Sequence, residues 1–150
     1  MAFTVEESLE FETSPEAAFD ALADHASWAR WMPASFRPVG PSLGTLRAGV
    51  RPWVRVAHLP LPSRLRLEIV ERPREIAWGG GVPGVLWGAH AFRFEKGPRG
   101  ALVRSVETWS GALAALLAPL LRPIAARGAR EQLEAIRRGA LERARGGTAG

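Results

Sequence analysis

Residues 35–107 form short runs in which apolar and polar side chains alternate, and turn residues separate the runs. Alternation with a period of two is typical of strands that bury one face, whereas helices follow a period of 3.6. The pattern predicts a meander of six strands. Their expected ranges are residues 35–43, 50–58, 64–72, 75–79, 85–96 and 101–110, with the glycine-rich residues 79–84 as one of the separating turns.

The segment before the meander predicts one more strand and two short helices. Residues 3–12 alternate as a half-buried strand. Ser14, Pro15 and Glu16 then supply a capping hydroxyl, a proline for the first helical turn and an acid near the positive end of the helix dipole. We expect a helix to about residue 23 and a second one over residues 25–31.

The segment after the meander predicts a long helix. From residue 112 the chain is rich in Ala, Leu, Arg and Glu, and Leu133, Ile136 and Ala140 lie on one helical stripe. Pro119 and Pro123 should kink or divide this helix, because proline removes a backbone hydrogen bond and clashes with the preceding turn.

Length and composition indicate one globular domain. At 150 residues with 47% hydrophobic side chains, the chain can bury a sizeable core. We expect a domain over residues 1–145 and a disordered tail over residues 146–150. The acidic N-terminus lacks the pattern of a secretory leader, which favours a cytoplasmic location. Residues 111–126 are apolar but too short and interrupted to predict a membrane span.

Charge is distributed unevenly along the chain. Seven acids and no Lys or Arg precede Arg30, whereas residues 122–145 contain seven Arg and three Glu. In a compact fold the two ends could attract each other. The net charge of +5 could also suit nucleic acid, but no nucleic-acid-binding module or clustered basic face with stacking aromatics is recognisable.

Four stretches of the chain resemble recurring sequence motifs of one superfamily. They are SPEAAFDALADHASWARWMP, VGPSLGTLRAGV, VERPREIAWGG and GAHAFRFEKGPRGALVRSVETWSG. In this order and spacing they are similar to the START-like (SRPBCC) helix-grip superfamily, which includes polyketide cyclase/dehydrase proteins and lipid-transport domains. The resemblance covers roughly residues 3–144. It implies an α+β helix-grip fold, in which a curved antiparallel sheet of about seven strands surrounds a long C-terminal helix and a cavity separates the two.

The resemblance also indicates which residues could line the cavity. His90, Phe92 and Phe94 share one face of their strand by alternation, and the resemblance favours Val103, Ser105, Glu107 and Trp109 as inward on the last strand. The expected ligand-binding set is Trp28, Trp31, His90, Phe92, Phe94, Ser105, Glu107 and Trp109. His90 and Glu107 are the candidate catalytic residues. Each could instead form a hydrogen bond to a neighbouring strand, to the other residue or to water in the cavity.

One acid does not fit the pattern of its strand. Glu7 shares a face with Phe3, Val5, Leu9 and Phe11, so either it lies at the cavity mouth or a bulge turns it outward.

Several kinds of site find no support in the sequence. There is no cysteine, no nucleophile-elbow serine and no phosphate-binding glycine loop before a helix. His25, His58 and His90 are widely spaced, so no metal site and no cofactor are expected.

Three functions remain open. The first is binding or carriage of a small hydrophobic or aromatic molecule, such as a lipid, an isoprenoid quinone or a polyketide. The second is a cyclase or dehydratase that uses His90 and Glu107 as acid/base groups. The third is peripheral contact with a membrane surface or a partner through the apolar residues 113–121, whose alternative role is packing across the cavity mouth. Residues 116–123 are predicted to be the mobile part of a ligand gate, because the prolines break backbone hydrogen bonds.

Overall fold

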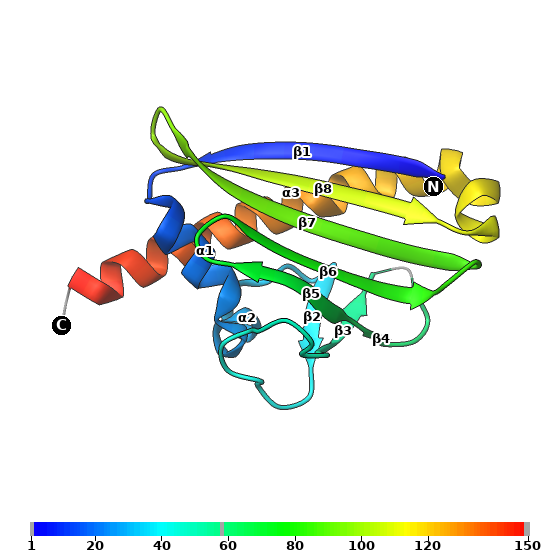
Figure 1. Cartoon of the computed structure of the whole chain (residues 1–150), viewed down its shortest axis with the longest axis horizontal. Coiled ribbons are helices and arrows are strands. Elements are labelled where there is room, and N and C mark those ends of the chain that lie inside the picture. Colours follow the sequence, from blue (N-terminus) through cyan, green and yellow to red (C-terminus); the bar gives the residue numbers. More distant parts are fainter. Residues whose placement is uncertain (1, 58, 149–150) are drawn as a thin grey trace.

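The computed structural model describes residues 2–57 and 59–148 and confirms the α+β helix-grip fold (Figure 1). The elements follow in the order β1 (Phe3–Phe11), α1 (Pro15–Ala23), the 3-10 helix η1 (His25–Ser27), α2 (Trp28–Trp31), β2 (Phe36–Val39), β3 (Trp53–Val56), β4 (Ser63–Arg64), β5 (Arg66–Glu71), β6 (Glu75–Val82), β7 (Leu86–Gly97), β8 (Gly100–Ser110) and α3 (Ala112–Thr148). The predicted tail is helical at residues 146–148, and residues 149–150 lie outside the described residues.

The strands form two antiparallel sheets instead of one continuous sheet. The larger sheet has the order β1-β8-β7-β6-β5, and the smaller one has the order β2-β3-β4. The run expected at residues 64–72 is divided, because β4 pairs with β3 while β5 pairs with β6. The strand expected at residues 50–58 is shorter, and residue 58 lies outside the described residues. Figure 1 shows α3 running along the larger sheet, with the smaller sheet below it.

The prediction that residues 79–84 form a turn is wrong for residues 79–82, which continue strand β6. Large side chains explain why glycine occupies this strand. A Cβ on Gly79 would lie 2.6 Å from the Trp87 ring, and a Cβ on Gly80 would lie 3.2 Å from Leu65. The glycines therefore let bulky side chains approach the strand backbone, a use of glycine that alternation alone does not reveal.

The N-terminal helices begin where the sequence predicts. The Ser14 hydroxyl accepts a hydrogen bond of 3.1 Å from the backbone N–H of Ala17, and Pro15 occupies the first helical turn. The segment expected as one helix at residues 25–31 is divided into η1 and α2. Helix α2 projects both of its tryptophans into the interior, where the Trp28 indole N–H donates to the Leu22 carbonyl at 2.8 Å.

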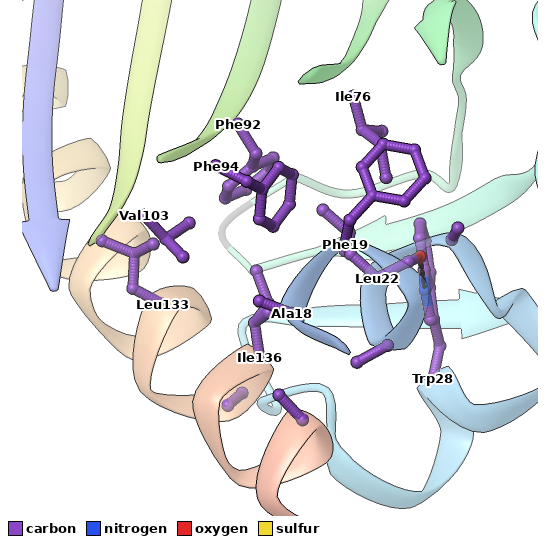
Figure 2. Close-up of a cluster of buried hydrophobic side chains, with 14 of the residues drawn as sticks. Ala18, Phe19, Leu22, Trp28, Ile76, Phe92, Phe94, Val103, Leu133 and Ile136 are labelled. Carbon is purple, nitrogen blue, oxygen red and sulfur yellow. Dashed lines mark hydrogen bonds between the residues drawn. The ribbon is translucent and has the colours of Figure 1, made fainter. Parts of the chain in front are cut away.

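One end of the interior is a continuous hydrophobic core (Figure 2). Helix α1, the C-terminal half of α3 and strands β6 to β8 all contribute to it. Its members in Figure 2 include Ala18, Phe19, Leu22, Trp28, Ile76, Phe92, Phe94, Val103, Leu133 and Ile136. Edge-to-face packing of Phe19 on Phe94, with ring centroids 5.5 Å apart, joins α1 to the sheet.

Helix α3 is continuous, so Pro119 and Pro123 do not divide it. In Figure 1 its first turns, drawn in yellow, lie at an angle to the longer orange and red part. By length and composition α3 could cross a membrane, contrary to the expectation from the sequence. Only 11% of its most apolar 18-residue stretch is buried. Gly111 joins β8 to α3 with φ 104°, where a Cβ would lie 2.4 Å from the Val85 carbonyl oxygen.

The oppositely charged ends of the chain pair with each other, as the charge distribution suggests. Arg130 and Arg137 of α3 contact Glu7 and Glu12 of the N-terminal segment at 2.9 and 2.7 Å. Arg143 contacts Asp24 at 3.3 Å. These pairs lie at the surface, where solvent screens the attraction, so each contributes little to stability.

Two glycines of α3 predict opposite responses to alanine. A Cβ on Gly139 would lie 2.6 Å from the Trp31 indole, whereas a Cβ on Gly128 would meet nothing within 4 Å. Gly139→Ala should lower the free energy of unfolding by about 1–3 kcal/mol through overpacking. Gly128→Ala should raise it by about 0.5–1 kcal/mol, because alanine favours the helix. Urea denaturation of both variants tests the packing, and a gain in stability for Gly139→Ala would contradict it.

Candidate functional site

A cavity of about 710 Å³ occupies the other end of the interior. Strands β6, β7 and β8 form one wall, the first half of α3 forms another, and residues from the smaller sheet and the segment before it form the third. The lining residues are mostly apolar, and they include Phe36, Val56, Leu65, Trp78, Leu86, Trp109, Leu121 and Ile124. Four glycines, Gly80, Gly81, Gly88 and Gly128, also belong to the lining. The volume is ample for a small organic molecule.

A polar cluster lies on the sheet wall of this cavity. The register of β7 and β8 places His90 directly opposite Glu107 and Phe92 opposite Ser105. His90 Nε2 is 2.6 Å from the Ser105 hydroxyl oxygen, and His90 Nδ1 is 3.8 Å from Glu107 Oε2. The Trp109 indole N–H donates to Glu107 Oε1 at 2.7 Å. Ser105 and Trp109 therefore hold the two candidate acid/base groups side by side.

Burial shifts the pKa values of both groups toward the neutral forms. Loss of hydration lowers the pKa of His90 from 6.5 to about 3, so the imidazole is uncharged at neutral pH. Burial raises the pKa of Glu107 from 4.5 to about 7, against the smaller opposing effect of the hydrogen bond from Trp109. The contact between His90 and Glu107 is therefore a polar pair and not an ion pair. Near neutral pH the Glu107 carboxyl can both donate and accept a proton.

Ion pairing on α3 forms a second polar region of the cavity lining. Arg127 donates to Glu131 at 3.1 Å, and the Ser35 hydroxyl donates to the other oxygen of Glu131 at 2.9 Å. The charge of Arg127 is thereby balanced within the lining, because Glu131 lies one turn further along the same helix. Gln132 lies next to Glu131 and is 4% exposed. Its side-chain nitrogen has no hydrogen-bond partner among the described residues.

The structure places the sequence-predicted residues in two groups. His90, Glu107 and Trp109 line the cavity, as the inner face of α3 also does. The others do not belong to its lining. Trp28, Trp31, Phe92 and Phe94 lie in the hydrophobic core, and Ser105 is fully buried behind His90. The inward strand faces agree with the structure, but α1 packs against β7, with Phe19 on Phe94. The cavity lining therefore does not include Phe92, Phe94 or Trp31, contrary to the prediction.

Sequence reasoning missed several residues of the lining. Trp78 pairs across the strands with His90, and their rings lie 5.8 Å apart. Its inward position follows from the register of β6, which the glycine run obscured. Gln132 could have been found, because it lies on the same helical face as Ile136, where a polar side chain is unusual. Gly128 gives no such signal in the sequence.

Glu7 reaches neither of its two expected positions. The pairing of β1 with β8 is continuous through Glu7 and Ser105, so no bulge turns the carboxylate outward. It is absent from the cavity lining and instead pairs with Arg130 of α3. The inward face of β1 is thus closed over by α3.

The described part of the chain has no group of three His, Asp or Glu side chains that could hold a metal ion. The imidazole of His25 packs on Trp28 and accepts a hydrogen bond from the backbone N–H of Leu43.

The raised pKa of Glu107 predicts a pH-dependent stability difference. Between pH 4.5 and about 7 the unfolded chain releases a proton that folded Glu107 retains, so this residue makes stability fall as the pH rises. Glu107→Gln removes this loss. Between pH 5 and pH 8 the variant should gain about 2 kcal/mol relative to the wild type. Chemical denaturation at both pH values measures the difference.

The matched control for this measurement is Glu95→Gln on the exposed face of β7. That variant should keep the pH profile of the wild type. Parallel profiles for Glu107→Gln and the wild type would contradict the burial of an ionisable carboxyl at this position.

Comparisons with solved structures place the fold among bacterial proteins of low sequence identity. A hypothetical protein from Helicobacter pylori is similar with a TM-score of 0.72 and 17% identity, over 91% of this chain and 86% of that one. A protein from Mesorhizobium loti has a TM-score of 0.71 and 16% identity, over 94% and 98%. An AHSA1-like protein from Aeromonas hydrophila has a TM-score of 0.68 and 16% identity, over 93% of each chain. At this identity the likeness establishes the fold alone.

Comparison with protein families is more specific. No curated protein matches the chain significantly. The family model for polyketide cyclase / dehydrase and lipid transport matches residues 2–145, almost the full length. The START-like resemblance read from the sequence is thereby confirmed, and the chain belongs to the polyketide cyclase / dehydrase and lipid transport family.

Proposed function

We propose that this protein binds a small hydrophobic or aromatic molecule in the cavity between β6 to β8 and α3. The observation that carries the proposal is the unequal filling of the interior. One end is tightly packed with buried aromatic and aliphatic side chains, whereas the other has an apolar cavity of about 710 Å³. Unfilled apolar volume costs stability, so a cavity of this size is typical of a ligand site.

The family membership supports the same proposal at a coarser level. Its description includes lipid transport and polyketide chemistry, both of which involve apolar molecules. The ligand remains a class, which includes lipids, isoprenoid quinones and polyketides. A cytoplasmic location, as expected from the sequence, remains a prediction.

Blocking the cavity should weaken ligand binding without harming the fold. A suitable probe is prodan, a fluorescent aryl ketone small enough for this volume. Gly128→Leu places a branched side chain into open space on the α3 wall. We expect it to weaken prodan binding at least about tenfold, equivalent to about 1.4 kcal/mol. Fluorescence titration provides the affinity.

The matched control is Gly146→Leu, which makes the same substitution at an exposed position near the end of α3. Neutral replacements of the polar pair, His90→Gln and Glu107→Gln, should change affinity by less than about tenfold. Trp109→Ala should cost more, because it removes lining area and a hydrogen-bond donor. Equal affinity in the wild type and Gly128→Leu would refute the cavity as the binding site.

Acid/base catalysis is the second candidate function, and the specific observation that favours it is Glu107. A carboxyl with a pKa of about 7, beside neutral His90 in an apolar cavity, suits proton transfer to and from a bound carbonyl compound. Cyclisation and dehydration of polyketides both begin with removal of a proton next to a carbonyl group. His90 would then orient the carboxyl, with Ser105 fixing the ring.

Proton exchange on bound prodan tests this candidate. If Glu107 acts as a base, the hydrogens next to the prodan carbonyl should exchange with deuterated water faster in the presence of the protein. The rate should rise with pH and reach half its maximum near pH 7. Glu107→Gln should abolish the acceleration while binding persists. Mass spectrometry measures the exchange, and an unaccelerated rate with tight binding leaves carriage as the function.

The third function considered from the sequence concerns the exposed surface of α3. Leu116 is 75% exposed and Leu120 is 62% exposed, and Leu113 and Ile124 continue the stripe. Peripheral contact with a membrane or a partner through this stripe remains a separate proposal. Leu121, which belongs to residues 116–123, also lines the cavity, as does the neighbouring Ile124. Mobility of residues 116–123 as a ligand gate stays a prediction.

A further inference from the structure

The side-chain amide nitrogen of Gln132 is a buried donor that the described part of the chain leaves without a hydrogen bond. Its side chain is 4% exposed and lies in the cavity lining, and Nε2 has no partner among the residues described. Buried donors are almost always hydrogen-bonded, because an unmet donor costs free energy. A side chain such as leucine or methionine would fill the same helical position without that cost. The amide therefore points to an acceptor that enters the cavity.

Space for such an acceptor lies one turn earlier on the same helix. Gly128 is four residues before Gln132, and both belong to the cavity lining. A Cβ at Gly128 would meet nothing within 4 Å, so no packing contact explains the glycine. Glycine within a helix is unfavourable compared with alanine. Gly128 and Gln132 thus lie one turn apart on the cavity-lining face of α3, and the open space at Gly128 forms a notch in the helix wall next to the buried amide.

The charges around this notch favour a neutral ligand group. Arg127 is paired with Glu131, and Glu131 also accepts a hydrogen bond from Ser35. Glu107 is the other acid in the lining, and His90 is uncharged at neutral pH. The part of the lining that the structure describes thus has no unbalanced cation for a carboxylate or phosphate. Bringing an anion into this cavity would therefore require desolvation without a compensating charge.

We propose that Gln132 and the notch at Gly128 form a second polar subsite, which receives a neutral acceptor oxygen such as a ketone or quinone carbonyl. The inference rests on the proposed ligand-binding function and narrows its ligand class. The ligand is an apolar molecule with a carbonyl oxygen toward α3, and a free fatty acid or another carboxylate is selected against. Gln132 is a specificity-determining residue in this arrangement.

Two matched probes test the subsite. They are prodan and its propyl analogue, in which a methylene group replaces the carbonyl. Gln132→Met keeps the length of the side chain and removes the donor. We expect it to weaken prodan binding about five- to tenfold, the size of one hydrogen bond, and to leave the affinity for the propyl analogue within about twofold. The infrared carbonyl stretch of bound prodan should lie at a higher frequency in the variant than in the wild type.

Stability measurements separate a ligand-directed amide from a structural one. Without ligand, Gln132→Met should be at least as stable as the wild type, because it removes an unmet donor. Thr13→Val is the control, since Thr13 has a buried hydroxyl without a partner in the described chain but lies outside the cavity lining. It should leave the affinities for both probes unchanged. A marked loss of stability in Gln132→Met would assign the amide a structural role and overturn the inference.

The remaining outcomes distinguish this inference from the proposal on which it rests. If Gln132→Met affects both probes equally, or neither, the subsite is refuted while the cavity remains a binding site. If the carboxylate analogue of prodan binds as tightly as prodan at pH 8, the selection for a neutral group is refuted. If the wild type binds neither prodan nor its propyl analogue, the ligand-binding function fails, and the subsite fails with it.

Discussion

The antiparallel pairing of β7 with β8 determines the position of the polar cluster and of the sheet wall of the cavity. It places His90 opposite Glu107 and Gly88 opposite Trp109, all on the concave face of the sheet. Side chains alternate between the two faces, so a shift of one residue would move the whole set to solvent. The polar cluster and the cavity wall therefore depend on one register, which the apolar side chains on the same face hold in place.

The interior separates the hydrophobic core, which stabilises the fold, from the cavity and its polar groups. Around α1 and the C-terminal half of α3, aromatic and aliphatic side chains pack closely and account for most of the hydrophobic stabilisation. The opposite end contains the cavity and its polar groups, which contribute little to stability or oppose it. Helix α3 belongs to both regions, with Leu133 and Ile136 in the core and Gly128 and Gln132 on the cavity wall. Burial in the packed half can thus offset the free-energy cost of the cavity in the other half.

Burial also changes what the polar groups can do. In water a glutamate and a histidine at neutral pH would be charged and largely neutral, respectively. Inside this cavity the pKa of Glu107 rises to about 7 while the pKa of His90 falls to about 3. The pair then offers an apolar ligand hydrogen bonds with little fixed charge. The same property makes Glu107 suitable for proton transfer, so the two proposed functions would use one arrangement and would differ in whether the ligand has an acidic proton within reach.

The sequence by itself determined the order of the elements and the inward face of β7, because alternation and helix capping depend on neighbours along the chain. His90 could be selected for the same reason. The helix-grip fold and the inward position of Glu107 on β8 were inferred from the family resemblance, because alternation alone leaves the face of that strand ambiguous. Only the tertiary structure decided which inward residues meet the cavity. Phe92 and Phe94 share a face with His90, but α1 covers them and leaves His90 at the open end. Likewise, only the tertiary structure shows that Gln132 is buried and that its amide nitrogen has no partner among the described residues, since burial and hydrogen bonding depend on residues distant in sequence.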